Sequence, residues 1–292
     1  MPWLQLTTRL PSQHADAAAE ALEEAGAISV TLQDAAGEIV IETQWDQTPL
    51  WSKVCLSALL PEDANVAEVE RTLMQRLALE QPLEYRLERV DDQDWAQAWK
   101  QHYKPIHMGG RLWVCPSWCE PPAPTGINVI LDPGMAFGTG DHPTTALCLE
   151  WLAQQELRDR MVLDYGCGSG ILAIAALKLG ARAAYAVDLD EQALTVAREN
   201  AARNGVADRL QVLSATALPP DFRAELVLAN ILAGALIELA PQLIAHTRPG
   251  GALVLSGLLT EQADMVRPHY CPPFELAMRE RNGWISLAGT RT

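Results

Sequence analysis

The spacing of apolar positions changes near residue 90, and the elements that it predicts before and after that point follow different orders. The first part alternates short strands with two helices, one of which places Val66, Val69, Leu73 and Leu77 on one face. The predicted strands span residues 3–9, 28–32, 38–42, 53–60 and 83–90, and the predicted helices span 15–25 and 66–79. This order, β-α-β-β-α-β with one extra strand, predicts a small α+β domain of the ferredoxin-like type.

The second part begins near residue 105 with two strands around a proline-rich loop, and from residue 161 strands alternate with helices, which predicts a parallel sheet covered on both faces. Strands are predicted at 111–115, 127–131, 161–165, 183–187, 210–213, 226–229 and 252–256. A helix that ends at Ala153 is followed by predicted helices at 170–179, 191–204, 232–245 and 261–269, with a turn at 249–251. The last two strands, 274–280 and 284–287, meet at Asn282-Gly283, which is typical of a hairpin and adds an antiparallel strand at one edge.

A helix is predicted between the two parts, with acidic residues in its first turn and Trp95 and Trp99 on one face. The two tryptophans are consistent with anchoring the helix on a domain and with setting the angle between domains. We therefore expect a first domain at 1–90, a linker helix at 91–104 and a second domain at 105–292. The first domain has neither a cluster of titratable residues nor a glycine-rich turn, so we expect it to serve in docking rather than in chemistry.

The composition and charge of the chain exclude several classes of protein. The 292 residues are 49% hydrophobic and 20% charged, which describes a globular protein with a full core. The formal charge of −15 disfavours a general electrostatic grip on nucleic acid. The six cysteines form no C-x-x-C pair and no metal-ligand spacing, so we expect free thiols and no metal. No leader of basic then apolar residues opens the chain, and we expect a cytoplasmic protein without a membrane segment.

A glycine-rich turn follows the strand predicted at 161–165. Glycine at such a turn lets a ligand approach the backbone and meet the N-terminus of the next helix. The glycines are Gly166, Gly168 and Gly170, whereas the dinucleotide fingerprint G-x-G-x-x-G requires a glycine where Ile171 stands. The G-x-G-x-G spacing is typical of S-adenosyl-L-methionine (SAM) methyltransferases and favours SAM over NAD. We interpret Cys167, inside the turn, as a packing residue.

Polar side chains stand at the ends of the predicted strands. Asp188 lies 22 residues after Gly166, and a carboxylate there can accept hydrogen bonds from both hydroxyls of a ribose. Asp190 is the nearby alternative, although the strand register favours Asp188. Asp164 precedes the turn, where NAD enzymes usually have an apolar residue. Asn230 ends another strand, where its amide would lie beside the reactive methyl group of a cofactor bound at the sheet.

Asn230 also resembles the asparagine of the Asn-Pro-Pro-Tyr motif of amino-methyltransferases. The rest of that motif is replaced by Ile231-Leu232-Ala233, which disfavours an amide-type nitrogen acceptor and leaves an amine acceptor open. Together with three other segments, this one makes the whole chain resemble the ribosomal protein L11 methyltransferase (PrmA) family. The four segments are Asp94-Trp95 to Tyr103-Lys104-Pro105, Phe137-Gly138-Thr139-Gly140-Asp141-His142-Pro143-Thr144-Thr145, Leu163-Asp164-Tyr165-Gly166-Cys167-Gly168-Ser169-Gly170 and Asn230-Ile231-Leu232.

The resemblance implies an α/β fold of the class I methyltransferase (Rossmann-like) type, with a seven-stranded sheet and a smaller N-terminal ferredoxin-like domain that recognises the substrate. It implies SAM as the cofactor. The residues that it implies for SAM binding are Phe137, Thr145, Asp164, Gly166, Gly168, Asp188 and Asn230. His142 lies with Phe137 in the loop over the cofactor, and Asn230 and His142 are the candidates for a catalytic role.

The family methylates the N-terminal α-amino group and lysine side chains of ribosomal protein L11, which would be the partner of a monomeric enzyme without nucleic-acid specificity. We infer an in-line displacement by a neutral amine, although lysine ordinarily titrates near ~10.4 and an α-amine near ~7.7–8. His142 and Asp141 are the nearby titratable candidates, and neither is assigned as the base. The alternatives are an NAD-dependent oxidoreductase, a methyltransferase acting on RNA or a small molecule, and a SAM-binding scaffold without activity.

Overall fold

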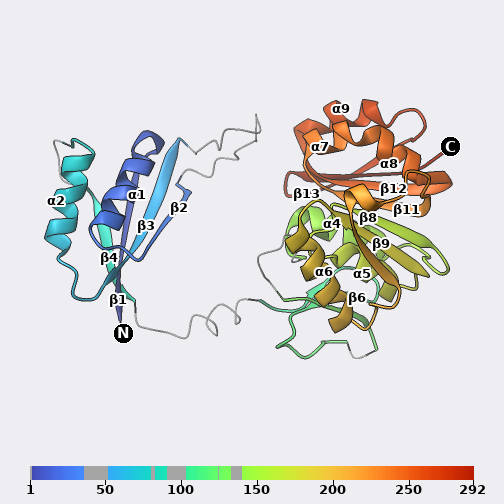
Figure 1. The fold of residues 1–292 in the computed structure, drawn as a ribbon, viewed down its shortest axis with the longest axis horizontal. Coiled ribbons are helices and arrows are strands. Elements are labelled where there is room, and N and C mark those ends of the chain that lie inside the picture. The colour runs from blue at the N-terminus through green and yellow to red at the C-terminus, as the bar shows by residue number, and fades with distance from the viewer. Residues whose placement is uncertain (1, 36–51, 80–82, 91–102, 124, 133–139) are drawn as a thin grey trace. The chain divides into compact units, whose positions relative to one another are not determined.

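The computed structural model describes residues 2–35, 52–79, 83–90, 103–123, 125–132 and 140–292. The chain divides into two compact units, Met1–Gln101 and His102–Thr292 (Figure 1). The predicted strand at 38–42, Phe137 and most of the predicted linker helix lie outside the described residues.

The N-terminal unit is an antiparallel sheet with two helices on one face (Figure 1). Its elements are β1 (Trp3–Pro11), η1 (Ser12–His14), α1 (Ala15–Glu24), β2 (Ser29–Asp34), β3 (Lys53–Pro61), α2 (Val66–Arg76) and β4 (Tyr85–Val90). The strand order is β2-β3-β1-β4. Buried side chains alternate along β3, so that Leu56 and Leu60 pack with Leu22 of α1 and Leu73 of α2. The predicted ferredoxin-like α+β domain is confirmed.

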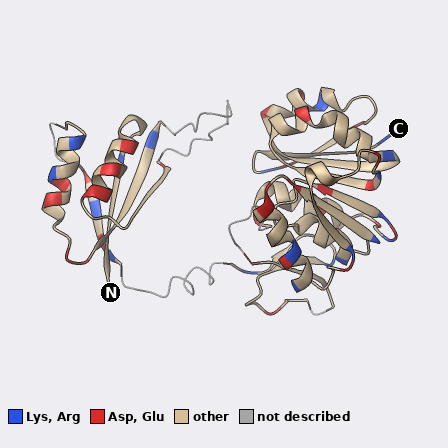
Figure 2. Ribbon diagram, in the orientation of Figure 1, with Lys and Arg blue, Asp and Glu red and all other residues tan. Residues whose placement is uncertain are grey.

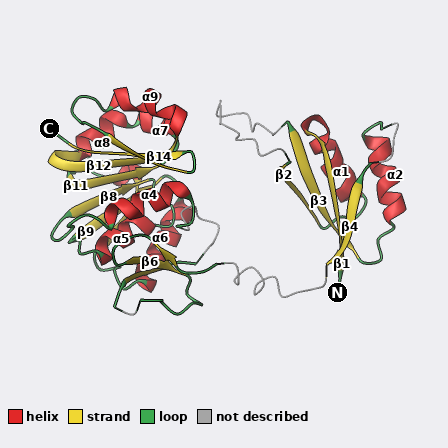
Figure 3. Ribbon diagram, turned by 180° about the vertical axis from the view of Figure 1, so that it is seen from behind, coloured by secondary structure: helices red, strands yellow, loops and turns green. Residues whose placement is uncertain are grey.

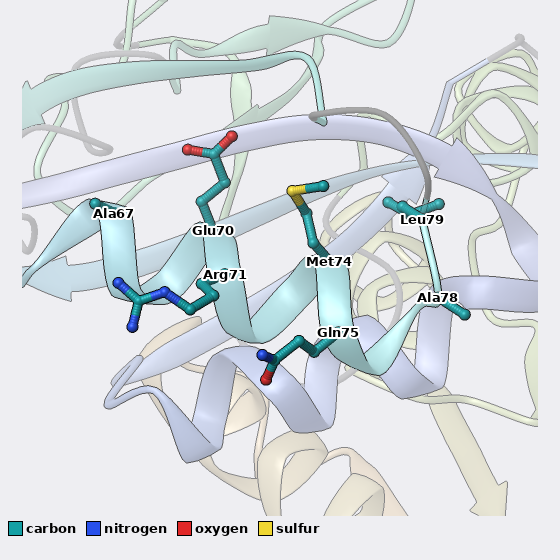
Figure 4. A pocket seen from close by; sticks show the side chains of 7 residues that line it. All are labelled: Ala67, Glu70, Arg71, Met74, Gln75, Ala78 and Leu79. Atoms are coloured by element: carbon teal, nitrogen blue, oxygen red, sulfur yellow. The ribbon is translucent and has the colours of Figure 1, made fainter.

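A groove of about 450 Å³ lies along α2 (Figure 4). Its lining residues are Ala67, Glu70, Arg71, Met74, Gln75, Ala78 and Leu79. The Glu70 carboxylate accepts a hydrogen bond from the Tyr85 hydroxyl of β4 at 3.3 Å. The whole lining belongs to the N-terminal unit, so this groove is distinct from the site predicted around the glycine turn.

The C-terminal unit is built on a seven-stranded sheet of order β10-β9-β8-β11-β12-β14-β13. Its strands are β8 (Met161–Tyr165), β9 (Ala183–Asp188), β10 (Leu210–Ser214), β11 (Ala224–Asn230), β12 (Thr247–Leu259), β13 (Ala277–Arg281) and β14 (Trp284–Thr290). The first five strands in this order are parallel, and β14 runs antiparallel to both β12 and β13. Because the order reverses between β8 and β11, their carboxyl ends form the switch point where such sheets bind ligands. The predicted class I methyltransferase sheet is confirmed.

Helices cover both faces of this sheet (Figure 3). One layer holds α4 (Pro143–Leu152), α5 (Ile171–Lys178) and α6 (Glu191–Arg203). The other holds α7 (Ala233–Glu238), α8 (Ala240–His246) and α9 (Ala263–Val266). Short 3-10 turns are η3 (Ala215–Ala217), η4 (Thr260–Gln262) and η5 (Arg267–His269). Because both faces are covered, the central strands are almost wholly apolar, and Leu226 to Ala229 of β11 are fully buried. None of these helices has the length and apolar character that crossing a membrane requires.

A small sheet packs beside the first helical layer. It consists of β5 (Ile106–His107), β6 (Leu112–Cys115) and β7 (Ile127–Ile130), in that order. Val129 of β7 belongs to the same buried cluster as Ile171 of α5. The strands β6 and β7 were predicted, whereas β5 is too short to give a period in the sequence.

Four predicted boundaries in the C-terminal unit were wrong. The helix expected at 232–245 is two helices, because Pro241 near the start of α8 has no backbone N–H to continue the hydrogen bonds of α7. The expected turn at 249–251 lies inside β12, where the pairing with β11 shifts its register. The helix expected at 261–269 is reduced to α9 between 3-10 turns, one of which contains Pro268. The strand expected from residue 274 begins at Ala277.

Candidate active site

The glycine turn between β8 and α5 has a backbone that other residues adopt only with strain. Gly166, Gly168 and Gly170 have φ values of 74°, 50° and 76°. A Cβ atom on Gly166 would also lie 2.3 Å from Cγ2 of Ile231, which follows β11. Both the backbone conformation and the packing against Ile231 therefore favour glycine at position 166.

Hydrogen bonds fix this turn to the neighbouring elements. The N–H groups of Gly166 and Cys167 both donate to the Val187 carbonyl of β9, at 2.8 and 3.0 Å. The N–H of Gly168 donates to Oδ2 of Asp188 at 2.9 Å. Cys167 is buried, and burial raises the pKa of its thiol, so it packs as a protonated side chain.

Asp188 and Asp190 have different surroundings. Oδ1 of Asp188 accepts the N–H groups of Leu189 and Asp190, at 2.8 and 3.1 Å, while its Oδ2 accepts that of Gly168. Asp190 instead caps α6, since its Oδ1 accepts the N–H of Gln192 at 2.9 Å. The carboxylate of Asp188 thus belongs to the glycine turn, whereas that of Asp190 belongs to the next helix.

Asp164 is a buried carboxyl group in β8, with 1% of its surface exposed. Its Oδ2 accepts the N–H of Ala173 of α5 at 3.1 Å, and its Oδ1 has no hydrogen-bond partner among the described residues. Burial raises its pKa to about 7; the Ala173 N–H acts in the opposite direction, and the charge of Asp188 adds to the rise. A cationic group placed at Oδ1 would favour the ionised carboxylate.

Asn230 has a similar buried oxygen at the end of β11. Its Nδ2 donates to the Thr145 hydroxyl of α4 at 3.3 Å, and its Oδ1 has no partner within the described part of the chain. Thr145 is fully buried. The structure therefore brings together two predicted site residues that are 85 positions apart. Because β8 and β11 are neighbours, the unsatisfied acceptors of Asp164 and Asn230 lie on adjacent strands at the switch point.

His142 starts α4 as its N-cap. Its Nδ1 lies 2.7 Å from the Thr144 hydroxyl and accepts the Thr144 N–H at 3.4 Å. Burial lowers its pKa, and the charge of Asp141 opposes that shift. The imidazole ring lies edge-on to Trp284, with 4.8 Å between ring centroids. Trp284 was not among the predicted site residues, although it opens the second strand of the predicted hairpin and so reaches the carboxyl edge of the sheet.

Comparison with known proteins identifies the family of this chain. The family model described as "Ribosomal protein L11 methyltransferase (PrmA)" matches residues 2–292. The chain belongs to this family. A ribosomal protein L11 methyltransferase of Shewanella amazonensis is 46% identical over 292 residues, which cover 100% of this chain and 99% of the relative. One of Pseudomonas putida is 48% identical over 292 residues and all of both chains.

A solved structure from the same family is also similar to this chain. The ribosomal protein L11 methylase of Lactobacillus delbrueckii subsp. bulgaricus is 34% identical, with a TM-score of 0.60, and the likeness covers 65% of this chain and 100% of that one. In this member of the L11 methyltransferase family, the hydrogen-bond acceptors at the switch point suit a ligand that carries N–H and O–H donors. Asp164 and Asn230 offer buried acceptors that lack a donor among the described residues, and Asp188 offers a carboxylate beside the glycine turn.

Proposed function

We propose that this chain transfers methyl groups from SAM to amino groups of ribosomal protein L11, namely its N-terminal α-amino group and lysine ε-amino groups. The observation that carries the proposal is the pair of unsatisfied buried oxygens of Asp164 and Asn230 on adjacent strands, in a chain that matches the L11 methyltransferase family along its length. The proposal implies that the enzyme acts in the cytoplasm, because ribosomes are found there.

The described residues fit SAM as follows. Asp188 would accept a ribose hydroxyl, Asp164 would face the cationic amino group, and the backbone of Gly166 and Gly168 would allow close approach. Thr145 and Asn230, which are already hydrogen-bonded to each other, would hold the reactive end. When bound, SAM supplies an electrophilic methyl group on a positively charged sulfur. We include Phe137 in this set on its sequence motif alone.

Asn230 would act on the methyl acceptor as well. Its Oδ1 can accept an N–H of the incoming amine and so direct the amine lone pair, which is the positioning on which a displacement reaction depends most. The amine must be neutral to react, and transfer from water into a buried site lowers its pKa. Because burial keeps His142 uncharged near neutral pH, the imidazole adds no positive charge that would repel the amine or the cofactor.

We also propose that residues 1–90 recognise L11. All of the SAM-binding residues that we assign belong to the C-terminal unit. Acidic side chains lie along α1 at Asp16, Glu20, Glu23 and Glu24, of which Glu20 and Glu24 also pair with Arg76 of α2 (Figure 2). A ribosomal protein needs lysine and arginine to neutralise RNA phosphates, so it presents basic surface to an acidic partner. A chain shortened to residues 103–292 should bind SAM with unchanged affinity but should not methylate L11.

The direct test is transfer of a labelled methyl group from SAM to purified L11, followed by peptide mapping of the labelled amines. Label on the α-amine or on lysines supports the proposal. Asn230→Ala, assayed with enough SAM to saturate it, should transfer the label more slowly. Absence of label from L11 would refute the assigned substrate. Label on RNA or a small molecule would favour another kind of methyltransferase, and binding of NAD without SAM would favour an oxidoreductase.

A further inference from the structure

We infer that Asn200 of α6 and Asn204, which caps the C-terminus of α6, form a brace that positions the glycine turn for SAM, and that they are positioning residues of the proposed reaction. Both side chains are buried, with 5% and 8% of their surfaces exposed. They lie one helical turn apart, and Nδ2 of Asn204 donates to the Asn200 carbonyl at 2.9 Å. The inference rests on the proposed function, because it concerns the same SAM site.

Asn200 holds the turn directly. Its Nδ2 donates to the Ser169 carbonyl at 2.9 Å, inside the segment that joins β8 to α5. Its Oδ1 accepts Nη1 of Arg203 at 3.2 Å. The Ser169 carbonyl is close to the start of α5, where the backbone turns through Gly168 and Gly170 with positive φ. A shift of this carbonyl would therefore move the backbone of the turn, including the N–H of Gly168 that donates to Asp188.

Asn204 holds the small sheet. Its Oδ1 accepts the N–H of Ile130 at 2.8 Å, and its Nδ2 donates to the Ile130 carbonyl at 2.7 Å. One carboxamide thus pairs with both backbone groups of a residue in β7, as a neighbouring strand would. Buried backbone groups that lose such partners destabilise a fold, so Asn204 fixes β7 firmly against the end of α6.

Arg203 extends the brace beyond β7. Its Nη1 lies 3.4 Å from Oδ2 of Asp132, which also accepts the N–H and the hydroxyl of Ser117, at Oδ1 and Oδ2 respectively. Since β7 packs on α5 as well, α6 is tied by polar contacts to the turn that begins α5 and to the strand that supports it. The turn and β7 are therefore held by a single helix face.

If the two asparagines position the glycine turn, their loss should weaken SAM binding, which a role in stability alone does not predict. Asn200→Ala and Asn204→Ala should each raise the SAM Kd, by about tenfold for Asn200 and less for Asn204. The double variant should be no worse than Asn200→Ala alone, because the two residues serve the same brace. In steady-state assays the KM for SAM should rise while the KM for L11 stays unchanged.

Arg209 offers a matched control in the same unit. Its Nη1 donates to the carbonyls of Leu177 and Ala181 at the far end of α5, at 3.2 and 3.0 Å. Arg209→Ala should lower the melting temperature as much as the asparagine variants do and leave the SAM Kd unchanged.

The experiment is calorimetric titration of the full-length wild type and four variants with SAM, together with hydrogen exchange of the peptides that cover the glycine turn and β7. Faster exchange at the turn in Asn200→Ala, with the weaker SAM binding described above, supports the brace. Asparagine variants that bind SAM like Arg209→Ala, or effects of the two asparagines that simply add, overturn it. Failure of the wild type to bind SAM would instead overturn the proposed function, and the exchange data alone would then decide whether the brace holds the turn.

Discussion

Replacing Asp164 by asparagine should change how the stability of the C-terminal unit depends on pH. In the folded protein, burial holds the pKa of this carboxyl at about 7, against an ordinary value of 3.8. Between these values the folded chain keeps a proton that the unfolded chain has released. Unfolding therefore releases a proton in that interval, and stability must fall as the pH rises towards 7.

The size of the effect follows from the same two values. At about 1.36 kcal/mol for each pH unit, the interval from 3.8 to about 7 corresponds to a loss of about 4 kcal/mol. This is a large part of the stability of a typical domain, which is about 5–15 kcal/mol. The carboxamide of the Asp164→Asn variant cannot ionise, yet its oxygen can still accept the Ala173 N–H, so the variant should lack this loss.

The assay is urea unfolding of the wild type and Asp164→Asn between pH 5.5 and 8.0, above the sequence pI of about 4.8. The transition to follow is the one that SAM shifts, which identifies the C-terminal unit. The difference in unfolding free energy between variant and wild type should grow by about 2 kcal/mol from pH 5.5 to 7 and then level off. Parallel pH profiles for the two proteins would refute the reasoning.

Four further variants test the site. Asp188→Ala should raise the SAM Kd at least about tenfold, because hydrogen bonds to charged groups contribute roughly 1.5–3 kcal/mol; an unchanged calorimetric Kd would contradict its role. Asp190→Ala, the matched control, removes the cap of α6 and should cost about 1 kcal/mol of stability without weakening SAM binding. In single-turnover assays Asn230→Ala should lower the methyl-transfer rate more than SAM affinity, and equal losses would show a role in SAM binding only. Gly166→Ala should cost roughly 2–5 kcal/mol in denaturant unfolding, since its Cβ would lie 2.3 Å from Ile231, and wild-type stability would refute that overlap.

The sequence predicted most of the fold because the apolar periods of this chain are strong. Both domain types and the edge hairpin at Asn282-Gly283 follow from those periods and from turn residues. The misplaced boundaries have local causes. The apolar spacing across residues 232–245 is that of one helix, but Pro241 divides the segment into two. Pro249-Gly250-Gly251 resemble a turn in sequence, but they lie inside β12, where the pairing with β11 shifts its register.

The site was less predictable, because its contacts join distant segments. The bond between Asn230 and Thr145 depends on how α4 packs at the end of β11, which no local pattern encodes. Position along the strand favoured Asp188 over Asp190, but only the structure shows that Asp190 is engaged as a helix cap. Trp284 could have been found by extending the hairpin prediction to the edge of the sheet, since the first residue of its second strand must lie there.

The three backbone N–H groups around Asp188 have a consequence for the speed and affinity of ligand capture. They fix both carboxylate oxygens before any ligand arrives, at 2.8 to 3.1 Å. Ordering a mobile side chain on binding costs roughly 0.5–1.5 kcal/mol in lost rotamer freedom. Here that entropy is already lost on folding, and a carboxylate has about four acceptor positions, so one remains for a hydroxyl. The carboxylate that we propose for ribose recognition is thus preorganised, and its encounter with a ligand requires no search among side-chain conformations.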